Sequence, residues 1–334
     1  MPRPRVILPP GRFGSNYHCI SRVVDRNFVF RVHERDVFRR IMRQVEAFSG
    51  VRVLTWTILS NHFHLLVHVA PRPEVELTDE EILSRCRALY SRPAMVKIEL
   101  EFAAAKRVGG EIRRALRARF LKRMNDLSEF MKTLKQKFTS WFNRKHGRVG
   151  VLWESRFKSV AVEGDWASLL KVAAYIDLNP VRAGLAEDPK DYRWSGYSEA
   201  VAGNRVARRG LSLALQGTKP GAHWGDVAPR YRKLLYGIGE EKACRRGLTR
   251  KAVAEAFKAG GELSLAQLLR CRIRYFSDGM AIGSERFVDS VFALVREAFG
   301  KHRTSGARKM VGGDWGDLRV ARALRIRPID PGDP

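Results

Sequence analysis

The chain has 334 residues, of which 45% are hydrophobic, so it can bury a sizeable core as one elaborated domain or two ordinary ones. Lys and Arg total 62 against 35 Asp and Glu, and the formal net charge of +27 favours a polyanionic partner, nucleic acid above all. No apolar run approaches the roughly 18 residues of a membrane span, and Met1–Arg12 lacks the apolar core of a signal peptide. We therefore expect a cytoplasmic, nucleoid-associated protein that has no membrane partner.

The first 70 residues have the pattern of a strand, a helix and a β-hairpin. Alternation predicts a strand over Tyr17–Val24, and helical spacing of apolar residues predicts a helix over Val37–Phe48 that ends at Gly50. β-Branched and aromatic residues predict two further strands, Val51–Ile58 and His62–Val69, joined by a short turn.

A charged insertion over residues 71–124, broken by prolines and glycines, then interrupts the pattern and contains helical segments such as Glu111–Arg123. An apolar stripe that begins at Leu127 predicts a core helix with a basic outer face, on which Lys132 and Lys135 lie.

The next elements are a strand over Val151–Glu163 and a helix capped by Asp165. This helix contains Tyr175 and should stop near Asn179, because the residue before Pro180 disfavours helical backbone.

Past residue 204 the pattern changes to short helices, including Arg250–Lys258, a capping box at Ser264 and a helix that starts at Ser284. We predict a first domain over residues 1–204, a separate helical C-terminal module over 205–327 and a disordered tail over 328–334. The four cysteines lie far apart and form no CxxC pair, which argues against a zinc ribbon or a disulfide framework.

Two histidines in the segment Asn61–Val67 are candidate metal ligands. His62 and His64 are two apart on a predicted strand, so both project from one face. Imidazole binds first-row divalent metals, and two histidines leave positions for another protein ligand, water and a phosphate oxygen. The alternative is that both are structural, as we expect of His68 further along the same face.

Tyr175 and Asn179 are i and i+4 on the predicted helix, so a phenol and an amide oxygen could reach the same ion or phosphate. Two alternatives stand beside this one: Tyr175 is an ordinary half-buried residue, and Asn179 stabilises the turn before Pro180.

Three segments together resemble the single-tyrosine HUH transposases, and especially their REP-associated branch. Asn61–Val67 resembles the metal-site strand of that family, Leu152–Ser159 its following strand, and Tyr175–Leu185 its nucleophile helix and exit turn. The resemblance covers roughly residues 11–200. The insertion over residues 71–124 is longer than the family pattern, which leaves its role open.

The resemblance implies that Tyr175 is the nucleophile, His62 and His64 are metal ligands, and Asn179 is the third ligand. It also implies cleavage of single-stranded or hairpin DNA through a 5′-phosphotyrosine intermediate, with Mg²⁺ or Mn²⁺ as cofactor, although two histidines would also fit zinc. The implied fold is α+β, a ferredoxin-like antiparallel sheet with helices on one face that bring Tyr175 to the histidines. A monomer and a homodimer both remain open.

Basic residues near these motifs are candidate phosphate contacts: Arg156, Lys158, Arg182, Lys132 and Lys135. For Trp153 and Phe157, stacking on bases and packing in the core are the alternatives. The C-terminal module either grips hairpin DNA, regulates access to the active site or supports the fold without touching DNA. Two other function classes stand against a transposase: a domesticated DNA-binding protein that no longer cleaves, and a metal-dependent nuclease that activates water.

Overall fold

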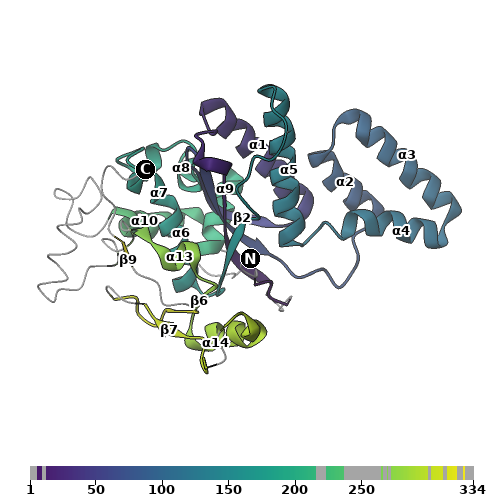
Figure 1. The fold of residues 1–334 in the computed structure, drawn as a ribbon. Helices are drawn as coiled ribbons and strands as arrows, with labels where there is room; N and C mark the ends of the chain where they lie inside the picture. Colours follow the sequence, from purple (N-terminus) through teal and green to yellow (C-terminus); the bar gives the residue numbers. More distant parts are fainter. Residues whose placement is uncertain are drawn as a thin grey trace, which may run out of the picture.

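The computed structural model describes residues 6–9, 13–215, 223–236, 265, 269, 272–299, 302–310, 314–321 and 326–327. Within these residues a central sheet has seven strands in the order β2-β3-β1-β4-β6-β8-β7 (Figure 1). None of the described helices is long and apolar enough to cross a membrane.

The N-terminal part of this sheet is a ferredoxin-like unit. Its strands β2, β3, β1 and β4 lie side by side and pair antiparallel, and a helix joins β1 to β2 while another precedes β4. The predicted α+β fold is therefore confirmed. The bounds are β1 Ser15–Arg22, the 3-10 turn η1 Val24–Arg26, α1 Val32–Ser49, β2 Arg52–Ile58, β3 His62–Val69, α5 Leu127–Lys145 and β4 Lys158–Val162.

The sheet is covered on both faces. Phe63 and Leu65 of β3 belong to the same buried cluster as the apolar residues of α1 and α5, whereas Leu66 belongs to the cluster of α6, Trp166–Asp177. Because successive strand residues point to opposite faces, α1 and α5 cover one face and α6 covers the other. Helices therefore cover both faces and not one as predicted, and α6, which lies on the face of His62 and His64, is the helix that brings Tyr175 to them.

Helix α1 ends where its sequence predicts. Gly50 adopts a left-handed backbone with φ of 71°, and its N–H bonds the carbonyl of Glu46, which closes the last turn. Phe38, Met42 and Val45 are fully buried along the inner face of the helix. This apolar stripe fixes α1 against the sheet.

The insertion over residues 71–124 forms three helices, α2 Asp79–Leu89, α3 Arg92–Val108 and α4 Gly110–Leu121, which extend beyond α1 and α5 (Figure 1). A capping box between Thr78 and Glu81 starts α2. Ile82, Phe102 and Phe120 join the core cluster of α1 and α5, so the insertion packs as part of that layer.

Asp165 caps α6 as expected, since its carboxylate accepts the backbone N–H groups of Ala167 and Ser168. The predicted stop near Asn179 is correct only in part. Pro180 needs no backbone donor in the first turn of a helix, and α7, Asn179–Arg182, follows α6 after one residue. The chain continues with η2 Pro189–Asp191, α8 Gly196–Val201, α9 Arg205–Leu215 and α10 Trp224–Tyr236.

The described part of 205–327 is not only helical, and this corrects the predicted helical module. Strand β6, Ala281–Gly283, pairs parallel with β4 and so continues the central sheet through β8, Arg319–Val320, and β7, Arg308–Lys309. Strands of two or three residues are too short to show an alternating pattern in the sequence. The other elements are β5 Arg272–Ile273, α13 Arg274–Asp278, α14 Glu285–Leu294, η3 Arg296–Ala298 and β9 Ile326–Arg327.

The helix that starts at Ser284 is present, and its hydroxyl accepts the N–H of Phe287. The helix expected over Arg250–Lys258, the capping box at Ser264 and the tail over residues 328–334 lie outside the described residues. The domain boundary near residue 204 stays a prediction.

Candidate active site

The two predicted metal ligands lie at the start of β3, between β2 and β1. His64 is paired with Ile20 of β1 and with Thr57 of β2, and His62 is paired with Arg22. Directly paired residues of antiparallel strands share a face, so these side chains lie together on the face that α6 covers. His64 is buried and His62 is half-buried.

The protonation of His62 follows from its neighbour Asn61. The amide nitrogen of Asn61 donates to the carbonyl of Arg26 at 3.1 Å, so its oxygen Oδ1 is the atom that faces His62 Nδ1 at 2.6 Å. Because this oxygen can only accept, His62 Nδ1 carries the proton. In a neutral ring Nε2 then holds the lone pair, which is the atom that binds a metal.

His64 is held by a residue that the sequence had not indicated. Its Nδ1 lies 2.9 Å from Nε2 of His18, and Nδ1 of His18 lies 2.7 Å from the backbone carbonyl of Phe276. His18 is on β1, two residues before Ile20, so strand alternation places it on the histidine face. The alternating stretch Tyr17–Val24 contained this signal, but the pairing of β1 with β3 was needed to use it.

Burial keeps both rings neutral. Desolvation lowers the pKa of His18 to about 3 and lowers that of His64 well below its usual range. The positive charge of Arg182 acts in the same direction on both rings, and Arg22 adds to it at His64. At neutral pH the two imidazoles are therefore uncharged.

Tyr175 of α6 lies against these histidines. Its ring centre is 6.1 Å from that of His18 and 6.4 Å from that of His64, both in edge-on arrangements. The ring centre of Phe276 lies 4.8 Å from that of Tyr175, and the guanidinium carbon of Arg182 lies 4.0 Å from the centre of the phenol ring. The side chain is 3% exposed, so Tyr175 is a buried neighbour of the histidine pair and not a surface residue.

Asn179 follows Tyr175 by one helical turn, as the sequence predicted. Its amide nitrogen donates to the carbonyls of Tyr175 at 3.2 Å and Ile176 at 3.3 Å. These bonds stabilise the end of α6, which is the alternative role considered for this residue. Only its side-chain oxygen could serve as a metal ligand, because an amide nitrogen does not coordinate.

The donor set fits a divalent ion with two protein nitrogens. The ring centres of His62 and His64 are 5.1 Å apart. Two imidazoles that share an ion at about 2.1 Å from each nitrogen have ring centres roughly 5 Å apart. Thr57, paired with His64, has a fully buried hydroxyl that makes no hydrogen bond in the described structure, which is consistent with a polar ligand beside it.

The described residues contain no group of three or more His, Cys, Asp and Glu side chains that could hold a metal. His18 does not complete such a group, because both of its ring nitrogens are engaged in hydrogen bonds. Among the described residues, only neutral oxygens remain as further protein ligands, and water or the substrate could supply others.

The predicted phosphate contacts lie in different settings. Lys158 is exposed and paired with Ile20, in the same row across the sheet as His64, and its amine bonds Asp278 at 3.1 Å. Arg156 is exposed just before β4. Arg182 is buried, and donates to the carbonyls of Tyr175 and Leu269, which favours a structural role over a phosphate contact.

The other two predicted contacts lie on α5. Lys132 is exposed and bonds Glu129 at 3.1 Å, and Lys135 donates to the carbonyl of Ser155 at 2.8 Å. Arg22 is a basic residue that the sequence reasoning missed. It lies on β1, directly opposite His62 of β3.

Trp153 and Phe157 belong to the core. Trp153 packs against Phe63 and Phe138, with ring centres 5.6 and 6.0 Å away, and its indole N–H donates to Thr139. Phe157 is 6% exposed within the same cluster. Core packing, the alternative to base stacking, is therefore what the structure shows for both side chains.

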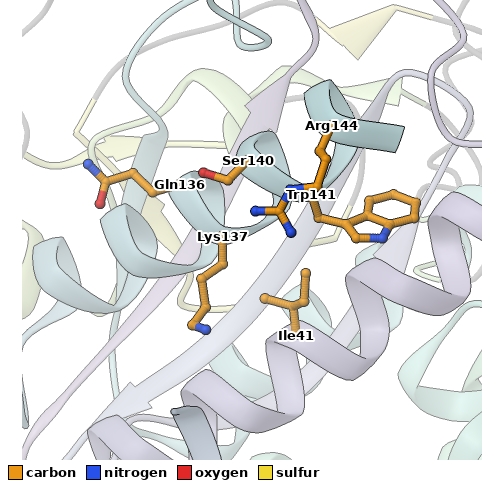
Figure 2. Close-up of a pocket in the computed structure, with 6 residues that line it drawn as sticks. All are labelled: Ile41, Gln136, Lys137, Ser140, Trp141 and Arg144. Atoms are coloured by element: carbon orange, nitrogen blue, oxygen red, sulfur yellow. The ribbon is translucent and has the colours of Figure 1, made fainter. Parts of the chain in front are cut away.

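A hollow of about 350 Å³ lies between α1 and α5, on the face opposite the histidines. Figure 2 shows Lys137, Trp141 and Arg144 of α5 around it, with Ile41 of α1 on the far side. None of the histidines or Tyr175 lines this hollow, so it is not part of the candidate active site.

Comparison with known proteins bears on the same segment. Residues 12–82 match the family of IS200-like transposases. The match spans roughly a fifth of the chain, includes His18, His62 and His64, and ends in α2, before Tyr175. It confirms the predicted resemblance to the single-tyrosine transposases and supports an enzyme that acts on DNA.

Among solved structures, the chain is similar to a REP-associated tyrosine transposase bound to a REP hairpin. The identity is 15% and the TM-score 0.37, with 63% of this chain and 92% of that chain covered. Comparison with the curated proteins gave no match.

Proposed function

We propose that the chain is a metal-dependent transposase that cuts and rejoins single-stranded DNA, with Tyr175 as its nucleophile. The observation that carries the proposal is the meeting of Tyr175 from α6 with His64 from β3, whose ring centres are 6.4 Å apart. These residues come from distant parts of the sequence, and the fold brings them to one face of the sheet.

The reaction is an exchange of phosphodiester partners. The oxygen of Tyr175 attacks phosphorus, the bond from phosphorus to the 3′ oxygen of the DNA breaks, and the phenol proton passes through water to that oxygen, which leaves as a 3′-hydroxyl. The product is a 5′-phosphotyrosine. Since one phosphodiester replaces another, a second 3′-hydroxyl reverses the step and rejoins strands without ATP.

His62 and His64 are the residues that would hold the ion, each through Nε2, with Asn179 Oδ1 proposed as a third ligand. A divalent ion bound there would stabilise the negative charge that develops on the phosphate oxygens. Two imidazoles without a carboxylate favour Mn²⁺ over Mg²⁺, because Mg²⁺ prefers oxygen ligands. The guanidinium of Arg182 lies against the phenol ring and adds fixed positive charge beside the nucleophile.

We place the DNA strand along the open end of the histidine face. Arg22 lies opposite His62, and Lys158 lies two strands from His64, roughly 10 Å away at the usual spacing between strands. Both side chains are long enough to contact phosphates that flank the scissile one. Arg156 extends this basic edge, whereas Lys132 and Lys135 would contact DNA from α5.

The motif resemblance extends the proposal to hairpins beside repeated palindromes and to a location on the nucleoid. Whether one chain or two form each active site is left open by these motifs. The net charge of +27 supports a nucleic-acid partner in either case.

A covalent trap tests the proposal. Full-length protein is incubated with Mn²⁺ and a pool of labelled single strands, each with a hairpin and randomised flanks, and is then denatured on a gel. We expect a protein–DNA adduct that Tyr175→Phe abolishes and Tyr197→Phe retains. Tyr197 is a matched control, because it is an equally buried tyrosine in the same core cluster that packs against Tyr231.

Sequencing the trapped strands would give the recognised DNA. Cleavage without an adduct that survives Tyr175→Phe would instead identify a nuclease that activates water. Binding without cleavage by the unaltered protein would identify a DNA-binding protein that no longer cuts.

A further inference from the structure

His18 has a place at the candidate site that none of the proposed catalytic roles uses. It is fully buried, and hydrogen bonds connect it to His64 on one side and to the carbonyl of Phe276 on the other. Its ring stacks beside that of His64, with centres 5.1 Å apart and planes inclined by 28°.

The direction of this hydrogen-bond chain follows from its end. A carbonyl oxygen can only accept, so Nδ1 of His18 must donate to Phe276. In a neutral His18 the other nitrogen, Nε2, then has no proton and accepts. Nδ1 of His64 is therefore the donor of the 2.9 Å bond, and the lone pair of His64 lies on Nε2.

A charged His18 would give His64 the opposite tautomer. Its Nε2 would donate, Nδ1 of His64 would accept, and the proton of His64 would move to Nε2, where it would block coordination. Full burial of the His18 ring disfavours its charged form.

We propose that His18 is a positioning residue that fixes the tautomer and ring orientation of His64, so that Nε2 is presented to the metal ion. It does for His64 what Asn61 does for His62, where Oδ1 accepts the Nδ1 proton. Outer partners of this kind orient ligand histidines and affect metal affinity. The metal part of this inference rests on the proposed function, whereas the tautomer part concerns the metal-free protein.

Two variants separate the hydrogen bonds of His18 from its bulk. His18→Gln keeps an oxygen that can accept from His64 and an amide N–H that can donate to Phe276. His18→Leu fills a similar volume and removes both bonds. His68→Leu is the control, because His68 lies further along β3 and its Nδ1 is 2.9 Å from Oδ1 of Asn16.

The first measurement is the imidazole ¹⁵N spectrum of the full-length, metal-free protein labelled at histidine, with His64 assigned by its loss in His64→Ala. We expect one tautomer for His64, protonated at Nδ1, in the unaltered protein, in His18→Gln and in His68→Leu. His18→Leu should show both tautomers in exchange.

The second measurement is Mn²⁺ affinity, from the electron paramagnetic resonance signal of the free ion. His18→Leu should bind Mn²⁺ about tenfold to a hundredfold more weakly, and His18→Gln should restore most of that loss. A single unchanged tautomer and unchanged affinity in His18→Leu would overturn the inference. Neither readout involves the adduct, so absence of the adduct would reject the proposed function and leave the role of His18 to be decided separately.

Discussion

Asp177 lies between Tyr175 and Asn179 in the sequence of α6 and ties this helix to its surroundings. Its carboxyl group is fully buried and accepts from the Thr55 hydroxyl at 2.7 Å and from the Tyr231 hydroxyl at 2.5 Å. Desolvation raises its pKa from an ordinary 3.8 to about 7. Replacing it with Asn removes the titration while it keeps the shape of the side chain.

The direction in which stability changes with pH depends on whether Asp177 ionises at lower pH in the folded or in the unfolded protein. Between pH 4 and pH 7 the unfolded chain ionises Asp177 while the folded protein keeps it protonated, so stability falls as pH rises. A pKa that moves from 3.8 to about 7 corresponds to about 4 kcal/mol of unfolding free energy across this window. Above pH 7 the group ionises in both states and its contribution is constant.

The assay is urea unfolding of Asp177→Asn and of unaltered protein at pH steps from 4 to 8, followed by tryptophan fluorescence. Burial of His18 acts in the opposite direction, because its folded pKa of about 3 makes stability rise with pH. The difference between the two proteins is therefore the informative quantity. Between pH 4 and pH 7 we expect the unfolding free energy of Asp177→Asn to rise by about 4 kcal/mol relative to that of the unaltered protein. Parallel pH curves for Asp177→Asn and the unaltered protein would refute the reasoning.

Replacing His62 or His64 with Ala should abolish the adduct in the gel assay, while hairpin affinity in a filter-binding assay is largely kept; loss of both would indicate a folding defect. Lys158→Ala should weaken hairpin binding for all sequences and reduce the logarithmic salt slope by about one, and an unchanged slope would place the DNA elsewhere. A chain that ends after residue 204 should unfold at lower urea than the full chain, because it loses strands that continue the sheet and apolar residues that belong to the core cluster of α6. Mn²⁺ should bind Tyr175→Phe more tightly when hairpin DNA is present, as measured by titration with and without DNA.

The elements of the ferredoxin-like unit were predictable because each has a strong period. The stripe of α1 and the alternation of β3 specify buried faces that tertiary packing then uses. The sequence could not say which sheet face receives α6. That choice is decided by Phe63 and Leu65, which fill the core under α1 and α5 and leave the histidines for the other side.

Arg182 and His18 show what sequence reasoning about the site could not reach. Arginine is rarely buried unless its donors are satisfied, so the sequence predicted a surface contact for Arg182. In the fold, the carbonyls of Tyr175 and Leu269 accept its N–H groups, and Leu269 is distant in the sequence. His18 likewise depends on the carbonyl of Phe276, a residue in the segment predicted as a separate module.

The charges around the histidine pair determine how ion and DNA depend on each other. Both candidate ligand rings lie beside positive groups, Arg22 and Arg182, and the described residues place no acidic cluster there. A divalent ion held by neutral nitrogens in a positive surrounding lacks a compensating negative charge. A phosphate of the DNA would supply this negative charge, so the protein should bind the ion more tightly when DNA is present. By linkage the ion must raise the affinity for DNA by the same factor, which couples the assembly of this site to the binding of the strand that it would cut.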